Sequence, residues 1–257
     1  MAKVRAAVLA AGRGVRIGAD RPKTLLPVGE HAPLLHYILD GIRRGGIDDL
    51  LVVTGFEPAL VQAFVTEEWG SENASFVFNA RFASWGNFHS VRMALEQSPG
   101  RDVLIVNSDI AIHPEVFERV LQSDGDLILA VQRRPDLDEE DMRVELDRTR
   151  VRQIGKHIKQ VRSHGEYAGV SLIRREAARL YLDMASDLEW LAATSLYYED
   201  LYARLIGKVE VRAASVQPGE YAEVDEPAEF EHAQQVLERH RDAWDARPAS
   251  ERNAQPA

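Results

Sequence analysis

Small and basic residues follow an apolar run near the start of the chain, in the stretch LAAGRGVRIGADRPKT at positions 9–24. Gly12 and Gly14 permit backbone conformations that other residues avoid, and they let a ligand lie close to the backbone. Arg13, Arg16 and Lys23 add positive charge near these glycines. Because backbone N–H groups and guanidinium groups both bind phosphate oxygens, this composition predicts a site for a phosphate-bearing ligand.

Two common phosphate-binding loops do not match this stretch. A P-loop has glycine directly before its Lys-Ser/Thr pair, but here Pro22, which lacks an N–H group, precedes Lys23 and Thr24. A dinucleotide-binding fingerprint needs a third glycine at position 17, where this chain has Ile17. The next apolar run, DLLVVTGF at 49–56, also ends without the acidic residue that would hold a ribose.

The stretch resembles the signature L-A-A-G-x-G-x-R…P-K of the nucleotidyltransferases that build NDP-sugars and CDP-alcohols. Eight positions agree in type and spacing, namely Leu9, Ala10, Ala11, Gly12, Gly14, Arg16, Pro22 and Lys23. The resemblance implies a nucleotide-binding set that consists of Leu9, Ala10, Ala11, Gly12, Arg13, Gly14, Arg16 and Lys23. It also implies that Lys23 neutralises charge between the acceptor and the α-phosphate and that Arg16 stabilises the departing pyrophosphate. The alternative is a glycine-rich turn between a strand and a helix, with arginines on the surface.

Two carboxylates further along the chain are candidates for holding a metal. Asp109 follows the apolar run VLIV at 103–106, and Asp225 precedes the last helical segment in a D-x-P sequence. Ligands of open α/β sheets bind beyond the carboxyl ends of the strands, which is where Asp109 falls. The resemblance implies that both aspartates ligate Mg²⁺, which prefers oxygen ligands, and that Asp109 belongs to the catalytic set. Alternatively, each aspartate caps the helix that follows it.

The segment NARFASWGNFHSVRMAL at 79–95 points to one particular group within this family. It resembles the N-x-x-(Y/F)-S-(L/V) turn of the bacterial CTP:phosphocholine cytidylyltransferase group, whose relatives use aminoalkyl phosphonates. The resemblance implies that Asn87 and Ser90 bind the nucleotide, and an asparagine can both donate to and accept from the edge of cytosine. The alternative is that Asn87 caps the helix that begins near Phe88.

A third segment, SLYYEDLYARL at 195–205, is similar to the region that holds the cationic head group in the phosphocholine enzymes. The resemblance implies that Tyr198 and Glu199 bind the acceptor. An ammonium gains from both a π face and a nearby carboxylate. In the alternative interpretation, Tyr197, Tyr198 and Tyr202 are core-facing residues of an ordinary helix.

The amino-acid composition excludes several classes of protein and of functional site. The chain has 257 residues, 45% of them hydrophobic, and no cysteine, so disulfides, thiolate metal sites and cysteine nucleophiles are excluded. The net charge of −10 argues against a nucleic-acid partner, because phosphate backbones demand a basic face. No stretch approaches the roughly 18 apolar residues of a membrane span, and the N-terminal apolar run is too short for a signal peptide. We therefore expect a cytoplasmic protein.

Strand-like and helix-like segments alternate through the first half of the chain. Strands are expected at 4–10, 49–56, 74–79, 102–109 and 126–134, and helices at 33–46, 58–70, 90–97 and 114–123. This alternation is typical of βαβ units, which form a mostly parallel sheet with helices on both faces. We therefore predict a Rossmann-like α/β fold, of the nucleotide-diphospho-sugar transferase type that the resemblance implies, with a small β-rich insertion.

The pattern changes after residue 134. We expect an exposed acidic loop at 133–142, a β-hairpin at 142–158, a strand leading into a helix at 166–176, helices at 188–207 and 227–244, and a strand at 208–215. We expect one nucleotidyltransferase domain at 1–240, with a nucleotide-binding half over about 1–134 and an acceptor-binding half over about 135–240. The final stretch ARPASERNAQPA at 246–257 lacks apolar periodicity, and we expect a disordered tail that falls within 241–257.

Together, these residues and the resemblance predict an Mg²⁺-dependent nucleotidyltransferase. The expected reaction moves CMP from CTP onto the phosphate or phosphonate of a small acceptor, such as phosphocholine or an aminoalkylphosphonate, and releases pyrophosphate. One alternative is a sugar- or cyclitol-1-phosphate nucleotidyltransferase that makes an NDP-sugar. A second alternative is a non-catalytic nucleotide-binding protein of the same fold, which would have no need of both Asp109 and Asp225.

Overall fold

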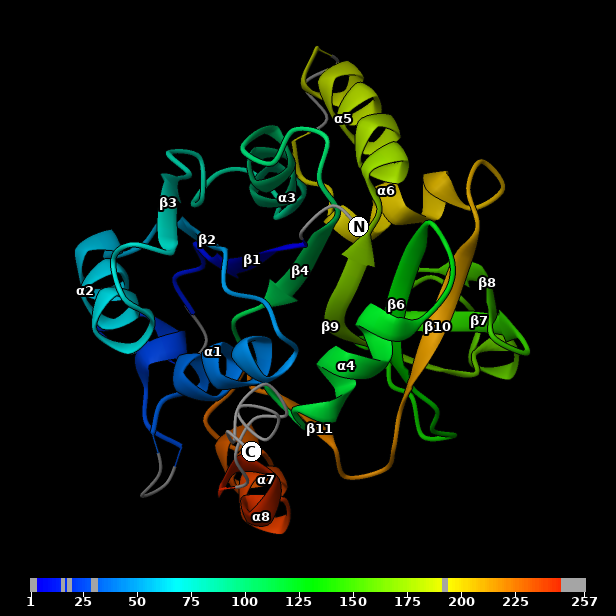
Figure 1. Ribbon diagram of the computed structural model, residues 1–257. Coiled ribbons are helices and arrows are strands. Elements are labelled where there is room, and N and C mark those ends of the chain that lie inside the picture. The colour runs from blue at the N-terminus through cyan, green and yellow to red at the C-terminus, as the bar shows by residue number, and fades with distance from the viewer. Residues whose placement is uncertain (1–3, 15–16, 18–19, 29–31, 191–193, 246–257) are drawn as a thin grey trace, which may run out of the picture.

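A nine-stranded mixed sheet runs through the computed structural model, which describes residues 4–14, 17, 20–28, 32–190 and 194–245 (Figure 1). Its strand order is β3-β2-β1-β4-β9-β6-β10-β8-β7. The strands are β1 (Arg5–Ala10), β2 (Leu50–Thr54), β3 (Ala74–Phe78), β4 (Val103–Asn107), β6 (Leu127–Gln132), β7 (Arg143–Asp147), β8 (Arg150–Ile154), β9 (Gly165–Ile173) and β10 (Val211–Val216). The β3, β2, β1 and β4 strands pair in parallel, as do β6 and β10, so the predicted mostly parallel α/β sheet is confirmed.

Helices cover both faces of this sheet. They are α1 (Leu34–Arg44), α2 (Pro58–Trp69), α3 (Phe88–Glu96), α4 (Glu115–Gln122), α5 (Arg175–Trp190), α6 (Tyr198–Leu205), α7 (Glu229–Arg239) and α8 (Arg241–Asp245). Figure 1 shows α3, α5 and α6 at the top of the view, with α1 and α4 below. Helices lie on both faces because successive side chains of a strand point to opposite faces of the sheet. In β1, Ala7 belongs to the core under α3, α5 and α6, whereas Ala6 and Val8 belong to the core under α1, α2 and α4.

The β9 strand departs from the alternating pattern because it lies antiparallel between β4 and β6. All nine of its residues are buried, as expected for a strand in the centre of a sheet. Gly169 has a φ of +72°, and a Cβ added there would lie 3.0 Å from the Cβ of Asn107. This glycine therefore lets β9 approach the end of β4 closely. The hairpin expected at 142–158 is present as β7 and β8.

The expectation of one helix over 188–207 is wrong. The α5 helix begins at Arg175 and ends at Trp190, and α6 begins only at Tyr198. Residues 191–193, which lie between them, are outside the described residues. Ser195–Tyr197 are not helical, and the N–H of Tyr197 donates to Asp200 Oδ2 at 2.8 Å, which fixes the first turn of α6.

The expectation of a disordered tail from residue 241 is wrong for its first part, because Arg241–Asp245 form α8. Residues 246–257 lie outside the described part of the chain. Among the described helices, none combines the length and the apolar character that a bilayer crossing requires.

A second, two-stranded sheet pairs β5 (Ile110–Ile112) with β11 (Tyr221–Glu223) in antiparallel fashion. The pairing places Ile110 opposite Glu223, and the N–H of Val224 donates to the carbonyl of Asp109 at 2.8 Å. This small sheet packs with α7 in a separate hydrophobic cluster. It therefore joins the end of β4 to a segment more than one hundred residues later.

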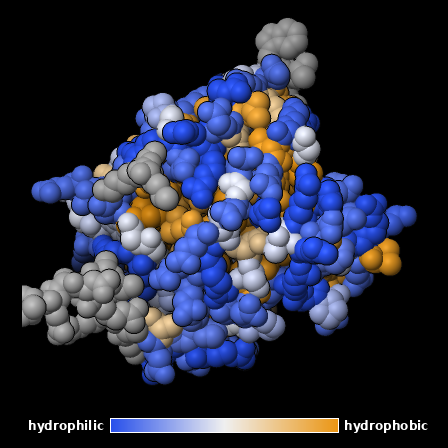
Figure 2. Space-filling view, turned by 45° about the vertical axis from the view of Figure 1, so that its right-hand side comes forward, coloured by the Kyte–Doolittle hydropathy of each residue, from blue (hydrophilic) through white to orange (hydrophobic). Residues whose placement is uncertain are grey.

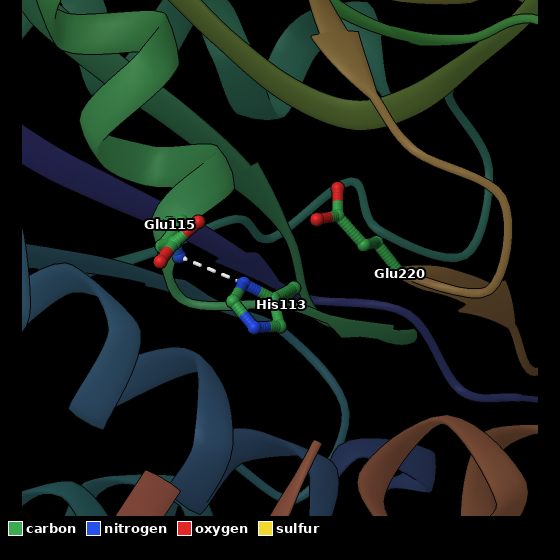
Figure 3. A group of neighbouring side chains, drawn as sticks. All are labelled: His113, Glu115 and Glu220. Carbon is green, nitrogen blue, oxygen red and sulfur yellow. Dashed lines mark hydrogen bonds between the residues drawn. The ribbon is translucent and has the colours of Figure 1, made fainter. Parts of the chain in front are cut away.

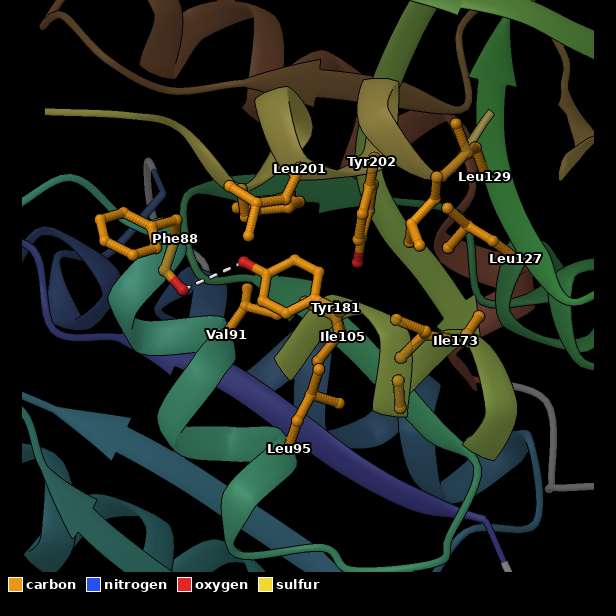
Figure 4. Packing of buried hydrophobic residues seen from close by; sticks show 14 of the residues in the cluster. Phe88, Val91, Leu95, Ile105, Leu127, Leu129, Ile173, Tyr181, Leu201 and Tyr202 are labelled. Carbon is orange, nitrogen blue, oxygen red and sulfur yellow. Dashed lines mark hydrogen bonds between the residues drawn. The ribbon is translucent and has the colours of Figure 1, made fainter. Parts of the chain in front are cut away.

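Figure 4 shows how the core under α5 holds the start of α3. Tyr181 is fully buried, and its hydroxyl donates to the carbonyl of Phe88 at 3.0 Å. Phe88 is the first residue of α3, so this bond fixes the point at which the preceding turn meets the helix.

Tyr181→Phe removes that donor and leaves the Phe88 carbonyl buried without it. We expect the free energy of unfolding to fall by about 0.5–1.5 kcal/mol, the usual net contribution of one hydrogen bond, because this carbonyl keeps its partner inside the helix. Urea unfolding followed by circular dichroism measures the change. An unchanged midpoint with an unchanged slope would show that this bond does not stabilise the fold.

Candidate functional site

The loop after β1 holds Lys23 against the end of the sheet. Gly14 has a φ of +63°, and a Cβ added to it would lie 2.8 Å from the Cβ of Lys23. A glycine is required there for both reasons, because other residues rarely adopt this conformation and would also collide with the lysine. Among the described residues, none lies within 4 Å of a Cβ added to Gly12. This part of the chain therefore leaves room beside Gly12, as a phosphate-binding loop needs.

The remaining residues of the predicted nucleotide loop lie at the end of β1 and just beyond it. Ala10 and Ala11 are buried, Leu9 is partly buried, and Arg13 is exposed with its guanidinium 5.4 Å from the centre of the Phe56 ring. Arg16 lies outside the described residues. The hydroxyl of Ser108 donates to the carbonyl of Leu9 at 2.8 Å, which ties this loop to the residue before Asp109.

The ammonium of Lys23 bridges the two carboxylates that the sequence singled out. Its Nζ lies 3.0 Å from Asp109 Oδ2 and 2.7 Å from Asp225 Oδ1. The Lys23 side chain is only 12% exposed. Burial acts to lower the pKa of Lys23, but the charges and hydrogen bonds of Asp109 and Asp225 outweigh it, so this pKa lies above its ordinary value. The lysine is therefore charged at neutral pH.

A third carboxylate, which the sequence analysis missed, belongs to the same group. Carboxylate oxygens of Asp109, Glu223 and Asp225 all lie within 4.8 Å of one another. Burial raises the pKa of Glu223 well above its ordinary value, and the nearby charges of Asp109 and Asp225 raise it further. Glu223 is the last residue of β11, and Asp225 follows two residues later. In a strand this spacing places two side chains on the same side, so the pattern E-V-D could have revealed Glu223.

This group fits a divalent cation that takes oxygen ligands. Asp109 Oδ1 is buried and has no hydrogen-bond partner, so it keeps a free lone pair. Mg²⁺ is usually held by one or two carboxylates together with waters and phosphate oxygens. Pairing of β5 with β11 supplies the geometry, because it brings Asp109 beside Glu223 and Asp225.

A cavity of about 910 Å³ opens beside the three carboxylates. Carboxyl groups predominate on its walls: Asp138, Glu140, Asp141, Glu166, Glu199, Glu226 and Glu229 line it, against Arg133, Arg134 and Lys156. The acidic loop at 133–142, expected only to be exposed, thus contributes to one wall. Figure 2 shows that hydrophilic residues predominate on one face of the molecule, with hydrophobic residues exposed between them. An acid-lined cavity of this size suits a small ligand with positive charge.

One of the carboxylates that line the cavity, Glu166, is deeply buried and forms an ion pair. It is 5% exposed, and Arg134 Nη2 lies 2.8 Å from its Oε2. The same guanidinium reaches Asp141 Oδ2 at 2.7 Å. Burial raises the pKa of Glu166 to about 7, with Asp141 adding to the increase and Arg134 opposing it. Arg134 therefore holds two acidic groups together in the wall.

Tyr198 and Glu199, the predicted acceptor residues, have different surroundings. Tyr198 is fully buried, does not line the cavity, and donates its hydroxyl to Asn107 Oδ1 at 2.9 Å. Its ring thus offers no face to a ligand, and Tyr197, which is 47% exposed, lines the cavity instead. Glu199 lines the cavity while only 5% exposed, and its Oε2 has no hydrogen-bond partner. Burial raises the pKa of Glu199 to about 7.

Asn87 and Ser90 also differ in exposure. Asn87 lines the cavity, and its Oδ1 accepts a hydrogen bond from the N–H of Tyr198 at 2.9 Å. Asn87 occupies the N-cap position of α3, as the alternative expected, but its side chain makes no capping bond there. Ser90 is 4% exposed and accepts from Asn79 Nδ2 at 3.0 Å within the protein. The structure thus brings Asn87, but not Ser90, to the cavity.

A second group of possible metal ligands, His113, Glu115 and Glu220, is engaged in other contacts (Figure 3). The two carboxylate oxygens of Glu220 accept from Arg119 at 2.7 and 2.8 Å. His113 Nδ1 accepts from the N–H of Glu115 at 3.2 Å. These bonds tie the start of α4 to the loop before β11, so the group positions the small sheet.

Comparison with known proteins places this chain among nucleotide-dependent transferases. The sequence profile of the MobA-like NTP transferase domain matches residues 6–191. A CMP-5'-(3-aminopropyl)phosphonate synthase from Streptomyces rubellomurinus is 33% identical over 120 residues, which are 46% of this chain and 19% of that protein. A bifunctional GlmU protein from Symbiobacterium thermophilum is 27% identical over 127 residues, 48% of this chain and 25% of that protein. The chain thus matches a quarter or less of the length of these two relatives.

Two solved structures share the fold over nearly their whole length. The inositol-1-phosphate CTP transferase from T. maritima has a TM-score of 0.77 at 20% identity, covering 93% of this chain and 98% of that one. The CTP:phosphocholine cytidylyltransferase from Streptococcus pneumoniae has a TM-score of 0.72 at 21% identity, covering 91% and 99%. At these identities the likeness establishes the fold, which is the one that the sequence predicted.

The Lys23 bridge leads to a test that needs no substrate. Lys23→Met removes the ammonium that bridges Asp109 and Asp225, so in EDTA we expect a melting temperature lower by about 3–10 °C, from about 1.5–3 kcal/mol for charged hydrogen bonds. Added Mg²⁺ should raise the melting temperature more in this variant than in the unaltered protein. Lys159→Met, at an exposed position, is the control. Equal Mg²⁺ effects in all three proteins would contradict a cation site at these carboxylates.

Proposed function

This chain belongs to the MobA-like NTP transferase family, and on that premise we propose that it moves CMP from CTP onto the phosphate or phosphonate of a small acceptor and releases pyrophosphate. The observation that carries this proposal is the cluster in which Lys23 bridges Asp109 and Asp225. The cluster lies at the edge of a cavity that is large enough for a small acceptor.

The choice of CTP is supported by two independent features. A relative that is 33% identical over nearly half of this chain is named as a CMP-phosphonate synthase. In the cavity, Asn87 uses its Oδ1 to accept from the Tyr198 N–H and keeps its Nδ2 for a ligand. An amide N–H₂ can donate to the carbonyl and ring nitrogen of cytosine.

The reaction needs positioning and charge neutralisation more than covalent participation of the protein. An oxygen of the acceptor phosphate attacks the α-phosphorus of CTP, and the bond from that phosphorus to the bridging oxygen breaks, so that pyrophosphate leaves with the electron pair. The backbone around Gly12 and Gly14 would face the triphosphate, and Arg16 would stabilise the pyrophosphate. Lys23 would neutralise the charge between the two reacting phosphates.

Mg²⁺ fits the oxygen atoms of Asp109, Glu223 and Asp225, and it would supply positive charge to both substrates' phosphates. Lys23 holds two of these carboxylates in place at 2.7 and 3.0 Å. Asp109 would act as the catalytic carboxylate because it lies at the carboxyl end of β4, beside the glycine loop.

An acceptor with an ammonium group agrees best with the cavity. Glu199 offers a buried oxygen without a partner, and carboxylates predominate around it. An aminoalkyl phosphonate or phosphocholine carries both the phosphate and the positive charge that this arrangement favours. Tyr198 would act on the acceptor only through Asn107, whose oxygen it binds.

A sugar- or cyclitol-1-phosphate acceptor is the second candidate. The structural likeness to an inositol-1-phosphate CTP transferase favours it. The cavity also has neutral polar side chains, Asn107 and Gln132, which can bond hydroxyl groups. A non-catalytic role agrees less well, because Lys23, Asp109 and Asp225 form one connected cluster.

Pyrophosphate release tests the proposal directly. The protein is mixed with Mg²⁺, one of the four nucleoside triphosphates and one of several acceptors: 3-aminopropylphosphonate, phosphocholine, inositol 1-phosphate or a hexose 1-phosphate. We expect release only with CTP and a cationic acceptor. Faster release with a neutral sugar phosphate would favour the second candidate, and no release with any pair would refute the proposed activity.

Asp109→Asn and Asp225→Asn each replace an anionic oxygen donor with a neutral one. We expect each to lower kcat/KM by about 100-fold or more, the scale on which a preorganised electrostatic group acts. Excess Mg²⁺ should recover part of the loss. Asp124→Asn, at a position away from the cavity, is the control. Turnover by the unaltered enzyme that survives EDTA would contradict the metal.

The raised pKa of Glu199 predicts how acceptor binding changes with pH. Since this carboxyl ionises near pH 7 rather than near 4.5, kcat/KM for a cationic acceptor should rise between about pH 6 and pH 8. Lys156 and Asp200 also act on Glu199, with opposite signs, and Tyr198 stays neutral because burial raises its pKa. Glu199→Gln should lose this rise.

Dividing kcat/KM of the unaltered enzyme by that of Glu199→Gln at each pH cancels the effect of the acceptor's own ionisation, because both enzymes use the same acceptor. We expect the ratio to grow by roughly tenfold, in line with a hydrogen bond to a charged group. A constant ratio across this range would show that Glu199 does not bind the ammonium.

A further inference from the structure

We propose that the ε-ammonium of Lys156 occupies, in the ligand-free protein, the subsite that a cationic acceptor's ammonium takes, so that the acceptor binds by displacing it. This inference rests on the proposed function, which supplies the acceptor, and goes beyond it by naming an internal competitor. Lys156 would thereby determine which acceptors enter the site.

Lys156 lies in the turn after β8, and its contacts are those of a bound alkylammonium. Its Nζ lies 2.9 Å from Glu140 Oε2 and 5.4 Å from the centre of the Tyr197 ring. All three residues line the cavity. An ammonium over an aromatic face, with a carboxylate beside it, is the arrangement by which proteins recognise alkylammonium ligands.

The same corner contains an acid that Lys156 does not satisfy. Glu199 is 5% exposed, lines the cavity, and keeps Oε2 buried without a hydrogen-bond partner. Lys156 is near enough to lower the pKa of Glu199, although no hydrogen bond joins the two. A buried carboxylate oxygen without a donor is unfavourable, so a second ammonium that reached it would gain an interaction that Lys156 lacks.

The lysine is held weakly enough to leave. The Glu140 side chain is 76% exposed and that of Lys156 is 33% exposed. An ion pair so close to water contributes little to stability, and four flexible methylenes connect the ammonium to the backbone. Displacement therefore breaks the weak ion pair between Lys156 and Glu140 and allows a stronger contact between the acceptor's ammonium and the buried Glu199.

Selectivity follows from this exchange. A ligand with an ammonium can replace Lys156 at Tyr197 and bond to Glu199, whereas a neutral ligand must share the corner with the lysine or move it without compensation. The apparent affinity of every cationic acceptor is lowered by the fraction of protein in which Lys156 occupies the subsite.

Isothermal titration calorimetry with 3-aminopropylphosphonate tests the competition without requiring turnover. Lys156→Met keeps the length of the side chain and removes its charge, so we expect about three- to tenfold tighter binding, on the scale of an exposed cation–π contact and ion pair. Binding of CTP should not change. Tyr197→Leu should weaken 3-aminopropylphosphonate and leave propylphosphonate, which lacks the ammonium, unaffected.

Arg133→Met is the matched control. Arg133 also lines the cavity and carries one positive charge, but it bonds to the carbonyl of Arg148 rather than approaching Tyr197. An equal gain in both variants would mean that long-range charge, not competition, controls binding, and would overturn the proposal. Weaker binding in Lys156→Met would overturn it as well, since the lysine would then contact the acceptor's phosphonate.

Failure of the proposed function gives a different result. If 3-aminopropylphosphonate binds and Lys156→Met tightens it, but no nucleoside triphosphate yields pyrophosphate, the subsite stands and the transfer reaction does not. If pyrophosphate is released and Lys156→Met leaves binding unchanged, the reaction stands and the displacement does not. Absence of binding to both proteins refutes the subsite.

Discussion

Carboxylates that gather in a partly buried place repel one another unless positive charge or a bound proton offsets the repulsion. Asp109, Glu223 and Asp225 lie within 4.8 Å of one another, and Lys23 is the cation that joins two of them. Burial raises the pKa of Glu223, and repulsion from Asp109 and Asp225 raises it further. Lys23 reaches this cluster by passing close to Gly14. A side chain at position 14 would collide with the lysine, so a glycine is needed there. Among the described residues, Lys23 is thus the cation that bridges the carboxylates of the candidate site.

The small β5–β11 sheet gives that cluster its shape. Ile110 pairs with Glu223, so the carboxylate after β4 meets two carboxylates from a distant segment. Bonds between Arg119 and Glu220 hold the beginning of β11 from the outside. Contacts between residues so far apart in sequence form late, because a long loop must close first. The geometry of this cluster is therefore a product of the complete fold rather than of any one βαβ unit.

The features that could be predicted from the sequence are those encoded within short stretches of the chain. The glycine loop, Lys23 and the two aspartates are recognisable because residue types and spacing repeat a family pattern, and the parallel strands because each is a continuous apolar run. The sequence did not predict the direction of β9, since periodicity carries no information about direction. Nor did it predict that Tyr197, not Tyr198, faces the cavity: Tyr197 precedes the first turn of α6, so helical periodicity does not determine its orientation. Glu199, by contrast, was identified and lines the cavity.

Both Glu140 and Lys156 come from the segment between β6 and β9, which forms the edge of the sheet with β7 and β8. The residues at the ends of β1 and β4 come from its interior. Edge segments tolerate replacement and insertion, because few other elements are packed against them. The carboxylate cluster and the corner that holds Glu140 and Lys156 thus belong to different parts of the sheet. A substitution in the β7–β8 hairpin can therefore change the wall of the cavity without moving Lys23 or Asp109.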